Sequence, residues 1–159
     1  ITPYDTETMH VLRAEKGFII AGQDSDGSVT PFDLDMSWAV GMKKSFSFIG
    51  KRGMQRKDCL REDRKQLVGL LTTDPKEVLE EGAQAVLDPN APKPMPMVGH
   101  VTSSYYSPNL DRSIAMAVIK GGLNKKGEKV YFPLADGRVI EAEITNPVFF
   151  DPKGDRQNV

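Results

Sequence analysis

Six short stretches between residues 66 and 145 are rich in apolar residues, either alternating with polar ones or in short continuous runs, and turn residues separate them. Spacings of this kind predict strands that are at least half buried. The predicted strands cover residues 66–71, 83–87, 97–105, 114–120, 129–134 and 138–145. A proline-rich loop follows the second strand at residues 88–94, and Asp136-Gly137 predicts a hairpin turn, where glycine adopts a positive φ. Six short strands with turns between them predict a small antiparallel barrel or sandwich.

The start of the chain predicts a helix over residues 6–16. Asp5 or Thr6 can cap it, because a side-chain oxygen accepts the unpaired amides of the first turn. Gly17 supplies the left-handed residue that ends a helix. The apolar run at residues 18–21 then predicts a buried strand.

In residues 31–65 the spacing of apolar residues predicts helices and strands less clearly than in the rest of the chain. Pro31 can begin a short helix through Asp35 that carries Trp38 and Val40 toward a core, and a second helix is predicted over residues 50–60. The densely charged segment 56–65 is the best internal boundary of the chain.

Composition narrows the possible classes of protein. The chain has 159 residues, which is the size of one domain and long enough to bury a sizeable core. Its 21 basic and 22 acidic residues give a formal net charge of −1, so no basic excess indicates nucleic-acid binding. Cys59 is the single cysteine, and no apolar run approaches the roughly 18 residues of a membrane span, so we expect a cytoplasmic protein that binds no membrane. The chain opens on Ile1 rather than Met, and we expect it to be a fragment of a longer polypeptide.

Common chemical motifs are not found in the sequence. There is no glycine-rich nucleotide-binding loop, and His10 and His100 lack the spacing of metal ligands. No activating base accompanies Cys59, so we interpret it as an inert thiol.

Two ordered blocks of sequence carry a family resemblance. One is G-H-V-T-S-S-Y-Y-S-P-N-L at residues 99–110, followed by S-I-A-M-A-V-I at 113–119. The other runs from H-V-L-R-A-E-K-G-F at residues 10–18 through G-Q-D at 22–24, T-P-F-D at 30–33 and W-A-V at 38–40 to F-I-G-K at 48–51. Together they resemble the folate-dependent aminomethyltransferases of the glycine-cleavage T-protein family. Ser104-Tyr105 stands where a glycine usually follows Thr-Ser, which is more similar to the alpha subunits of heterotetrameric sarcosine oxidases within that family.

The resemblance implies an α+β fold in three parts. Residues 1–60 correspond to the C-terminal portion of a folate-binding T-protein-like domain, residues 61–150 to a small antiparallel β-barrel, and residues 151–159 to a tail. It also implies a role in tetrahydrofolate-dependent capture of the one-carbon unit released when sarcosine is oxidatively demethylated. FAD, FMN and NAD would be bound elsewhere in the parent complex, and the partners would be the other oxidase subunits and folate. The family's catalytic aspartate would lie upstream of residue 1, so we expect no catalytic residue and no activity in the fragment itself.

Three residues are candidates for the folate site. Arg13 and Glu15 match the Arg-x-Glu of the family's L-R-x-E-x-G motif, whose helix borders the folate pocket. A guanidinium fork suits a folate carboxylate, and a carboxylate suits the paired N–H donors of a pterin. By spacing alone Arg13 and Glu15 are better explained as solvated charges on different helix faces, because two residues subtend about 200°; the resemblance is what makes them candidates. Trp38 is the third: such a residue usually lies in a core, and it can also stack on a flat heterocycle.

Two further functions remain open on the sequence. A stand-alone aminomethyltransferase or demethylase of the same fold would lack the long flavin- and NAD-binding region upstream. A non-catalytic barrel that packs against another subunit would require no folate at all.

Overall fold

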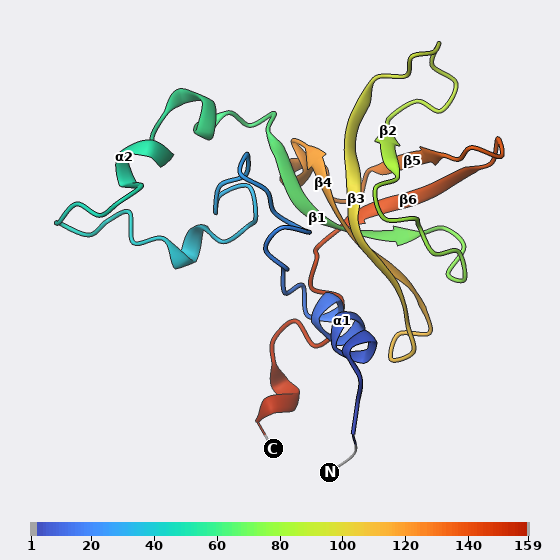
Figure 1. The fold of residues 1–159 in the computed structure, drawn as a ribbon, viewed down its shortest axis with the longest axis horizontal. Helices are drawn as coiled ribbons and strands as arrows, with labels where there is room; N and C mark the ends of the chain where they lie inside the picture. Colours follow the sequence, from blue (N-terminus) through green and yellow to red (C-terminus); the bar gives the residue numbers. More distant parts are fainter. Residues whose placement is uncertain (1–2, 159) are drawn as a thin grey trace.

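The computed structural model describes residues 3–158 and combines an antiparallel barrel with an irregular N-terminal part. Helix α1 (Thr6–Glu15) packs beside the barrel, and the segment that carries the short helix α2 (Lys51–Met54) extends away from it (Figure 1). Four short 3-10 helices complete the description: η1 (Ser37–Ala39), η2 (Lys57–Leu60), η3 (Gly122–Asn124) and η4 (Asp155–Gln157). In residues 3–158, no helix is long and apolar enough to cross a membrane.

Six antiparallel strands close the barrel in the order β1-β4-β3-β2-β5-β6. They are β1 (Lys65–Thr72), β2 (Gln84–Val86), β3 (Met97–Ser107), β4 (Arg112–Lys120), β5 (Lys129–Pro133) and β6 (Val139–Thr145). All six strands predicted from the sequence are present, and a closed barrel is found rather than a sandwich. The α+β fold class with a small antiparallel barrel is therefore confirmed.

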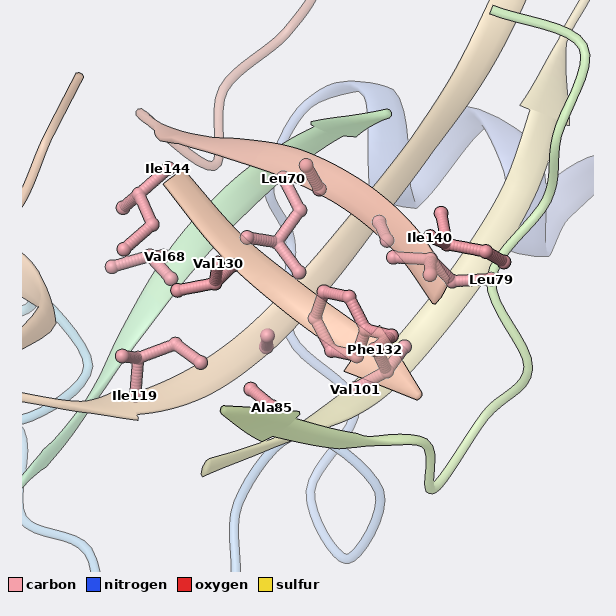
Figure 2. Packing of buried hydrophobic residues seen from close by; sticks show 13 residues of the cluster. Val68, Leu70, Leu79, Ala85, Val101, Ile119, Val130, Phe132, Ile140 and Ile144 are labelled. Carbon is pink, nitrogen blue, oxygen red and sulfur yellow. The ribbon is translucent and has the colours of Figure 1, made fainter. Parts of the chain in front are cut away.

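Inward-pointing side chains fill the barrel (Figure 2). Phe132 and Val130 of β5 meet Leu70 of β1 and Ile119 of β4 in this core, and each of the four is at most 1% exposed. Alternate residues of each strand point inward because the side-chain period of a strand is two. This core accounts for the alternation of apolar and polar residues in β5 and β6.

Strand β4 is buried on both faces. Ala115, Ala117 and Ile119 point into the barrel, whereas Ile114 and Met116 belong to a second apolar cluster with Ala14 of α1. Helix α1 contacts β3 and β4 on this outer side. The continuous apolar run of β4 is thus explained by a helix covering what would otherwise be a solvated face.

Helix α1 begins and ends as its sequence predicts. The Asp5 side chain accepts the Thr8 amide at 2.9 Å, and Gly17 has φ +69°. The amide of Phe18 donates to the Arg13 carbonyl at 2.9 Å, which turns the chain back toward the barrel.

Four predictions for the N-terminal part are wrong. Residues 31–35 form turns rather than a helix. Residues 18–21 form no strand: the Ile20 carbonyl accepts the amides of Gln23 and Asp24, so the chain turns instead of extending. The helix predicted over residues 50–60 is broken into α2 and η2. Trp38 does not enter a core, because it lies in the single turn η1 with 81% of its surface exposed.

Candidate functional site

A buried polar network joins helix α1 to the outer face of β3. The Arg13 guanidinium donates to the Asp24 carboxylate at 2.5 Å and to the Ser103 hydroxyl at 2.7 Å, and it lies within 3.3 Å of the Tyr105 hydroxyl. The Arg13 and Asp24 side chains are 9% and 0% exposed, so this ion pair is buried. A buried ion pair must be closely matched by hydrogen bonds to offset its desolvation.

Asp24 meets that requirement because every neighbour is a donor. Besides Arg13, its carboxylate accepts the amide of Ile20 at 2.9 Å and the hydroxyls of Thr102 and Ser103 at 2.6 Å each. The carboxylate thereby connects helix α1, the turn at residues 20–24 and strand β3. No feature of the sequence marks Asp24 or Ser103 as a site residue, although Asp24 lies in one of the two motif blocks and Ser103 in the other.

Glu15, two residues after Arg13 on α1, forms a second buried contact in the same seam. Its carboxylate accepts the Ser107 hydroxyl at 2.6 Å and the Asn109 amide at 2.9 and 3.1 Å, and the residue is 1% exposed. Its backbone carbonyl accepts the amides of Phe149 and Phe150, both at 2.9 Å. Glu15 therefore fixes the end of β3 and the segment after β6 against α1.

An apolar cavity of about 400 Å³ lies on the other side of the helix end. Trp38 and Phe18 line it from the N-terminal part, and Leu67 lines it from β1. Lys16 and Asp35 supply charges, and the ammonium of Lys16 donates to the Asp151 carbonyl at 2.6 Å. Phe18 is 63% exposed, so both aromatic rings present free surface at this cavity.

The three candidate residues do not meet in one cavity. Trp38 lines the apolar cavity, whereas Arg13 and Glu15 point into the seam between α1 and β3. In this arrangement the carboxylate of Glu15 makes its contacts within the protein, and the Arg13 fork is occupied by Asp24 and Ser103. Of the three, Trp38 alone offers an open surface to a ligand.

A smaller polar hollow of about 200 Å³ adjoins Asp24. His100 and Asp26 line it. Partial burial, followed by the charge of Lys65, lowers the pKa of His100 below its ordinary value. Hydrogen bonds from the hydroxyl and amide of Ser28 lower the pKa of Asp26. Within the described part of the chain, no three His, Cys, Asp or Glu residues cluster as metal ligands would.

A second ion pair attaches the N-terminal part to the start of the barrel. The Arg64 Nε lies 3.0 Å from both carboxylate oxygens of Asp33, and Nη1 donates to Asp58 at 2.9 Å. The hydrogen bonds to Asp33, followed by the negative charges of Asp33 and Asp58, raise the pKa of Arg64. The Asp33 carbonyl also accepts the Leu67 amide of β1 at 2.7 Å. Arg64 belongs to the charged segment that predicted a boundary, and it forms a contact across that boundary.

Two family models match the chain. The glycine cleavage T-protein C-terminal barrel domain matches residues 65–151, and the GCVT N-terminal domain matches residues 1–44.

Curated proteins of two kinds are similar to it. A sarcosine oxidase subunit alpha from Corynebacterium sp. (strain U-96) is 50% identical over 99% of this chain, and one from Rhizobium meliloti (strain 1021) is 37% identical over 100%. The matched region is 16% of each of those relatives, so the chain spans about a sixth of their length. An aminomethyltransferase from Nitrosomonas eutropha is 30% identical over 92% of this chain and 38% of its own length.

A solved structure shares the fold. The aminomethyltransferase T of the glycine cleavage system from Bartonella henselae superposes with a TM-score of 0.72, covering 90% of this chain and 38% of the other, at 23% identity. At that identity the likeness concerns the fold alone.

Proposed function

The chain belongs to the glycine cleavage T-protein family, and from that premise we propose that it is the C-terminal part of a sarcosine oxidase alpha subunit that serves the folate step. In this proposal, an amine is oxidised at a flavin site elsewhere in the parent complex. The released one-carbon unit is transferred to tetrahydrofolate, which gives methylenetetrahydrofolate. FAD, FMN and NAD are bound outside this chain, and the partners are the other subunits of the oxidase.

The observation that carries the proposal is the apolar cavity beside Trp38. A volume of about 400 Å³ lies within the range of small-molecule sites, which are mostly apolar with a few polar groups. An exposed indole and an exposed phenyl ring offer flat apolar faces, and flat heterocycles such as a pterin stack on such faces. Trp38 and Phe18 are exposed at the same cavity, and exposed apolar residues that gather at a cavity mark ligand or interaction sites, which supports a ligand at this position.

Lys16 and Asp35 supply the polar groups of the cavity. Lys16 lies at its rim, 3.6 Å from the Asp151 carboxylate, and its side chain is 23% exposed. An ammonium at the rim of an apolar cavity suits an anionic group carried by the ligand. We propose that Lys16 attracts the carboxylate end of folate while Trp38 stacks on its ring system.

We further propose that Arg13 and Glu15 support the site from behind. Both belong to the helix that ends at the cavity, and both attach that helix to β3 through buried hydrogen bonds. They therefore fix the position of Lys16 and Gly17, which line the cavity. Tetrahydrofolate supplies the nucleophilic nitrogens of the reaction, and this chain supplies binding and orientation.

The test uses the intact parent protein and two readouts. Oxygen consumption with sarcosine measures the oxidation, and the yield of methylenetetrahydrofolate measures the folate step. We expect Trp38→Ala to leave oxygen consumption unchanged and to weaken folate binding about 5- to 150-fold, the equivalent of roughly 1–3 kcal/mol for lost aromatic stacking.

The matched control is Tyr4→Ala, because Tyr4 is also a well-exposed aromatic residue and does not line the cavity. An unchanged folate yield in Trp38→Ala would contradict the proposed site. Loss of both readouts in Trp38→Ala would show a structural role for the indole.

A stand-alone aminomethyltransferase is the second candidate, favoured by the 30% identity to such an enzyme. The parent sequence distinguishes the two, because an upstream dinucleotide-binding fingerprint favours the oxidase.

A further inference from the structure

The chain after β6 folds back along helix α1. Figure 1 shows this segment passing the helix on its way to the C-terminus, and the amides of residues 149 and 150 both donate to the Glu15 carbonyl at 2.9 Å. A Cβ added at Gly17 would lie 2.8 Å from the carbonyl oxygen of Pro147, so the two backbones are in close contact. Residues 146–148 line the apolar cavity. The segment therefore forms one wall of the proposed folate site.

Asp151 begins a tight turn directly after this wall. Its φ is +46°, in the left-handed region that Asp and Asn adopt more readily than other side chains. Its carboxylate Oδ1 accepts the Asp155 amide at 2.9 Å, and its carbonyl accepts the Gly154 amide at 3.0 Å. The turn of residues 151–155 is thus fixed by hydrogen bonds to its first residue.

The carbonyl of Asp151 also holds Lys16, the residue that caps the C-terminus of α1. The Lys16 ammonium donates to that carbonyl at 2.6 Å, whereas the Asp151 carboxylate lies 3.6 Å away. The two side chains are 23% and 12% exposed, so bulk water screens this contact only partly. A carbonyl oxygen fixes the position of an ammonium and leaves its net charge in place.

A contact that served only to attach the segment would be arranged differently. The segment is already attached to α1 through the Glu15 carbonyl. A structural ion pair would bring the carboxylate into hydrogen-bond contact with the cation, as in the pair of Arg13 and Asp24. Among residues 3–158 the Lys16 ammonium donates a single hydrogen bond, and an ammonium has three donors. The other donors are available to an anionic ligand.

We propose that Asp151 is a positioning residue of the folate site. The turn of residues 151–155 holds the Lys16 ammonium beside the apolar cavity, where the ammonium binds the carboxylate end of folate. Among the described residues that line this cavity, Lys16 is the one cation, and Asp35 would repel a carboxylate. The position of the ammonium therefore decides where the anionic end of the ligand is bound. This inference rests on the proposed function and adds the C-terminal turn to its site.

Two substitutions separate the geometry of the turn from its charge. Asp151→Ala removes the acceptor of the Asp155 amide and introduces a residue that disfavours a positive φ, so the ammonium should lose its fixed position. Asp151→Asn removes the charge, keeps an acceptor oxygen and tolerates the same φ. The matched control is Asp155→Ala, which removes an exposed carboxylate from the same turn and leaves the backbone amide of residue 155 in place.

Binding is measured in the intact parent protein with two ligands. Tetrahydrofolate carries the reduced pterin ring and the carboxylates, and 6-methyltetrahydropterin carries the ring without them. We expect Asp151→Ala to weaken tetrahydrofolate binding about tenfold, the scale of one charge-assisted hydrogen bond, and to leave 6-methyltetrahydropterin binding unchanged. Asp151→Asn should bind tetrahydrofolate at least as tightly as the wild type, because a nearby negative charge is gone. The control should bind both ligands as the wild type does.

The position of Lys16 is also measured without folate. Acetic anhydride acetylates lysine amines, and peptide mapping gives the rate at Lys16 relative to the exposed Lys153 of the same segment. We expect Asp151→Ala to accelerate acetylation of Lys16, because its amine is released from the carbonyl. Asp151→Asn should keep the wild-type rate.

The results distinguish this inference from the proposed function. Unchanged tetrahydrofolate binding in Asp151→Ala, equal losses for both ligands, equal losses in Asp151→Ala and Asp151→Asn, or an unchanged acetylation rate in Asp151→Ala would each overturn the inference. If Trp38→Ala weakens tetrahydrofolate binding and Asp151→Ala does not, the proposed site stands and the positioning role is refuted. If Asp151→Ala selectively weakens tetrahydrofolate binding and Trp38→Ala has no effect, the positioning role is supported and stacking on Trp38 is refuted.

Discussion

Removing the charge of Asp24 should destabilise the contact between α1 and the barrel. The substitution Asp24→Asn keeps the size of the side chain and replaces one carboxylate oxygen by an NH₂ group. Four donors, from Arg13, Ile20, Thr102 and Ser103, surround that carboxylate. An NH₂ group must therefore face another donor, and Arg13 keeps its charge without an ionic partner.

The loss should be large because both side chains are buried. Breaking a buried ion pair by neutralising one member typically costs about 3–5 kcal/mol. Single domains are stable by about 5–15 kcal/mol, so Asp24→Asn should remove a substantial part of the free energy of unfolding. The exposed pair Arg138–Glu77, with side chains 65% and 30% exposed, provides the comparison: Glu77→Gln should cost about 1 kcal/mol or less.

Urea unfolding followed by circular dichroism gives both free energies. Hydrogen exchange on the same variants shows where the loss falls, and we expect amides of α1 to exchange faster while those of β4 keep their protection. A cost for Asp24→Asn no greater than that for Glu77→Gln would refute the reasoning. Equal acceleration in α1 and β4 would show that the seam stabilises the whole fold rather than the attachment of the helix.

Three more predictions concern the barrel and its surface. The pKa of His100 is lowered below 6.5 in the folded chain, so the unfolded chain takes up a proton first as the pH falls. The free energy of unfolding should therefore fall as pH drops below 6.5 and level off below the folded pKa. His100→Gln should remove this dependence of the melting temperature on pH. Amides at residues 114–118 should exchange far more slowly than those at 18–21, because the former lie in a two-sided core and the latter in a turn; equal protection would contradict the predicted difference in stability between the barrel and the N-terminal part. A Cβ added at Gly99 would collide with the Val118 carbonyl of β4, so Gly99→Ala should cost about 1–3 kcal/mol in a denaturant titration, whereas Gly53→Ala, where the added carbon meets open space, should be neutral or stabilising.

The sequence predicted the barrel well because its strands are specified locally. Alternation in β5 and β6, and the turn at Asp136-Gly137 between them, place each side chain inside or outside before any long-range contact forms. The N-terminal part lacks such local specification. Residues 18–21 have the apolar composition of a strand, but the carbonyl of Ile20 accepts turn hydrogen bonds from Gln23 and Asp24, and no neighbouring strand pairs with the segment in residues 3–158. Composition alone could not reveal that missing partner.

In the candidate site, too, the sequence indicates residues but not the residues with which they pair. Arg13 and Glu15 were identified by resemblance, and the residues that hold them are Asp24, Ser103 and Ser107. Those partners lie up to 92 residues away in sequence. A sequence pattern can name the residues of a buried network, but the pairing depends on the closed barrel that brings β3 to the helix.

The two motif blocks consequently have one structural explanation. L-R-x-E in the first block supplies the cation and a carboxylate of the seam. In the second block, Ser103 accepts from Arg13, and the Ser107 hydroxyl and the Asn109 amide donate to Glu15. A helix–barrel seam of this kind specifies how the two parts of the fold are joined, and it is independent of the ligand bound nearby. Under the proposed function, ligand choice depends on the residues around the apolar cavity, where the Trp38 side chain is 81% exposed. Substitutions in the seam should therefore lower the free energy of unfolding. Substitutions at the cavity should change folate affinity and leave the free energy of unfolding unchanged. Measuring both quantities on both sets of variants distinguishes residues that stabilise the fold from residues that bind the ligand.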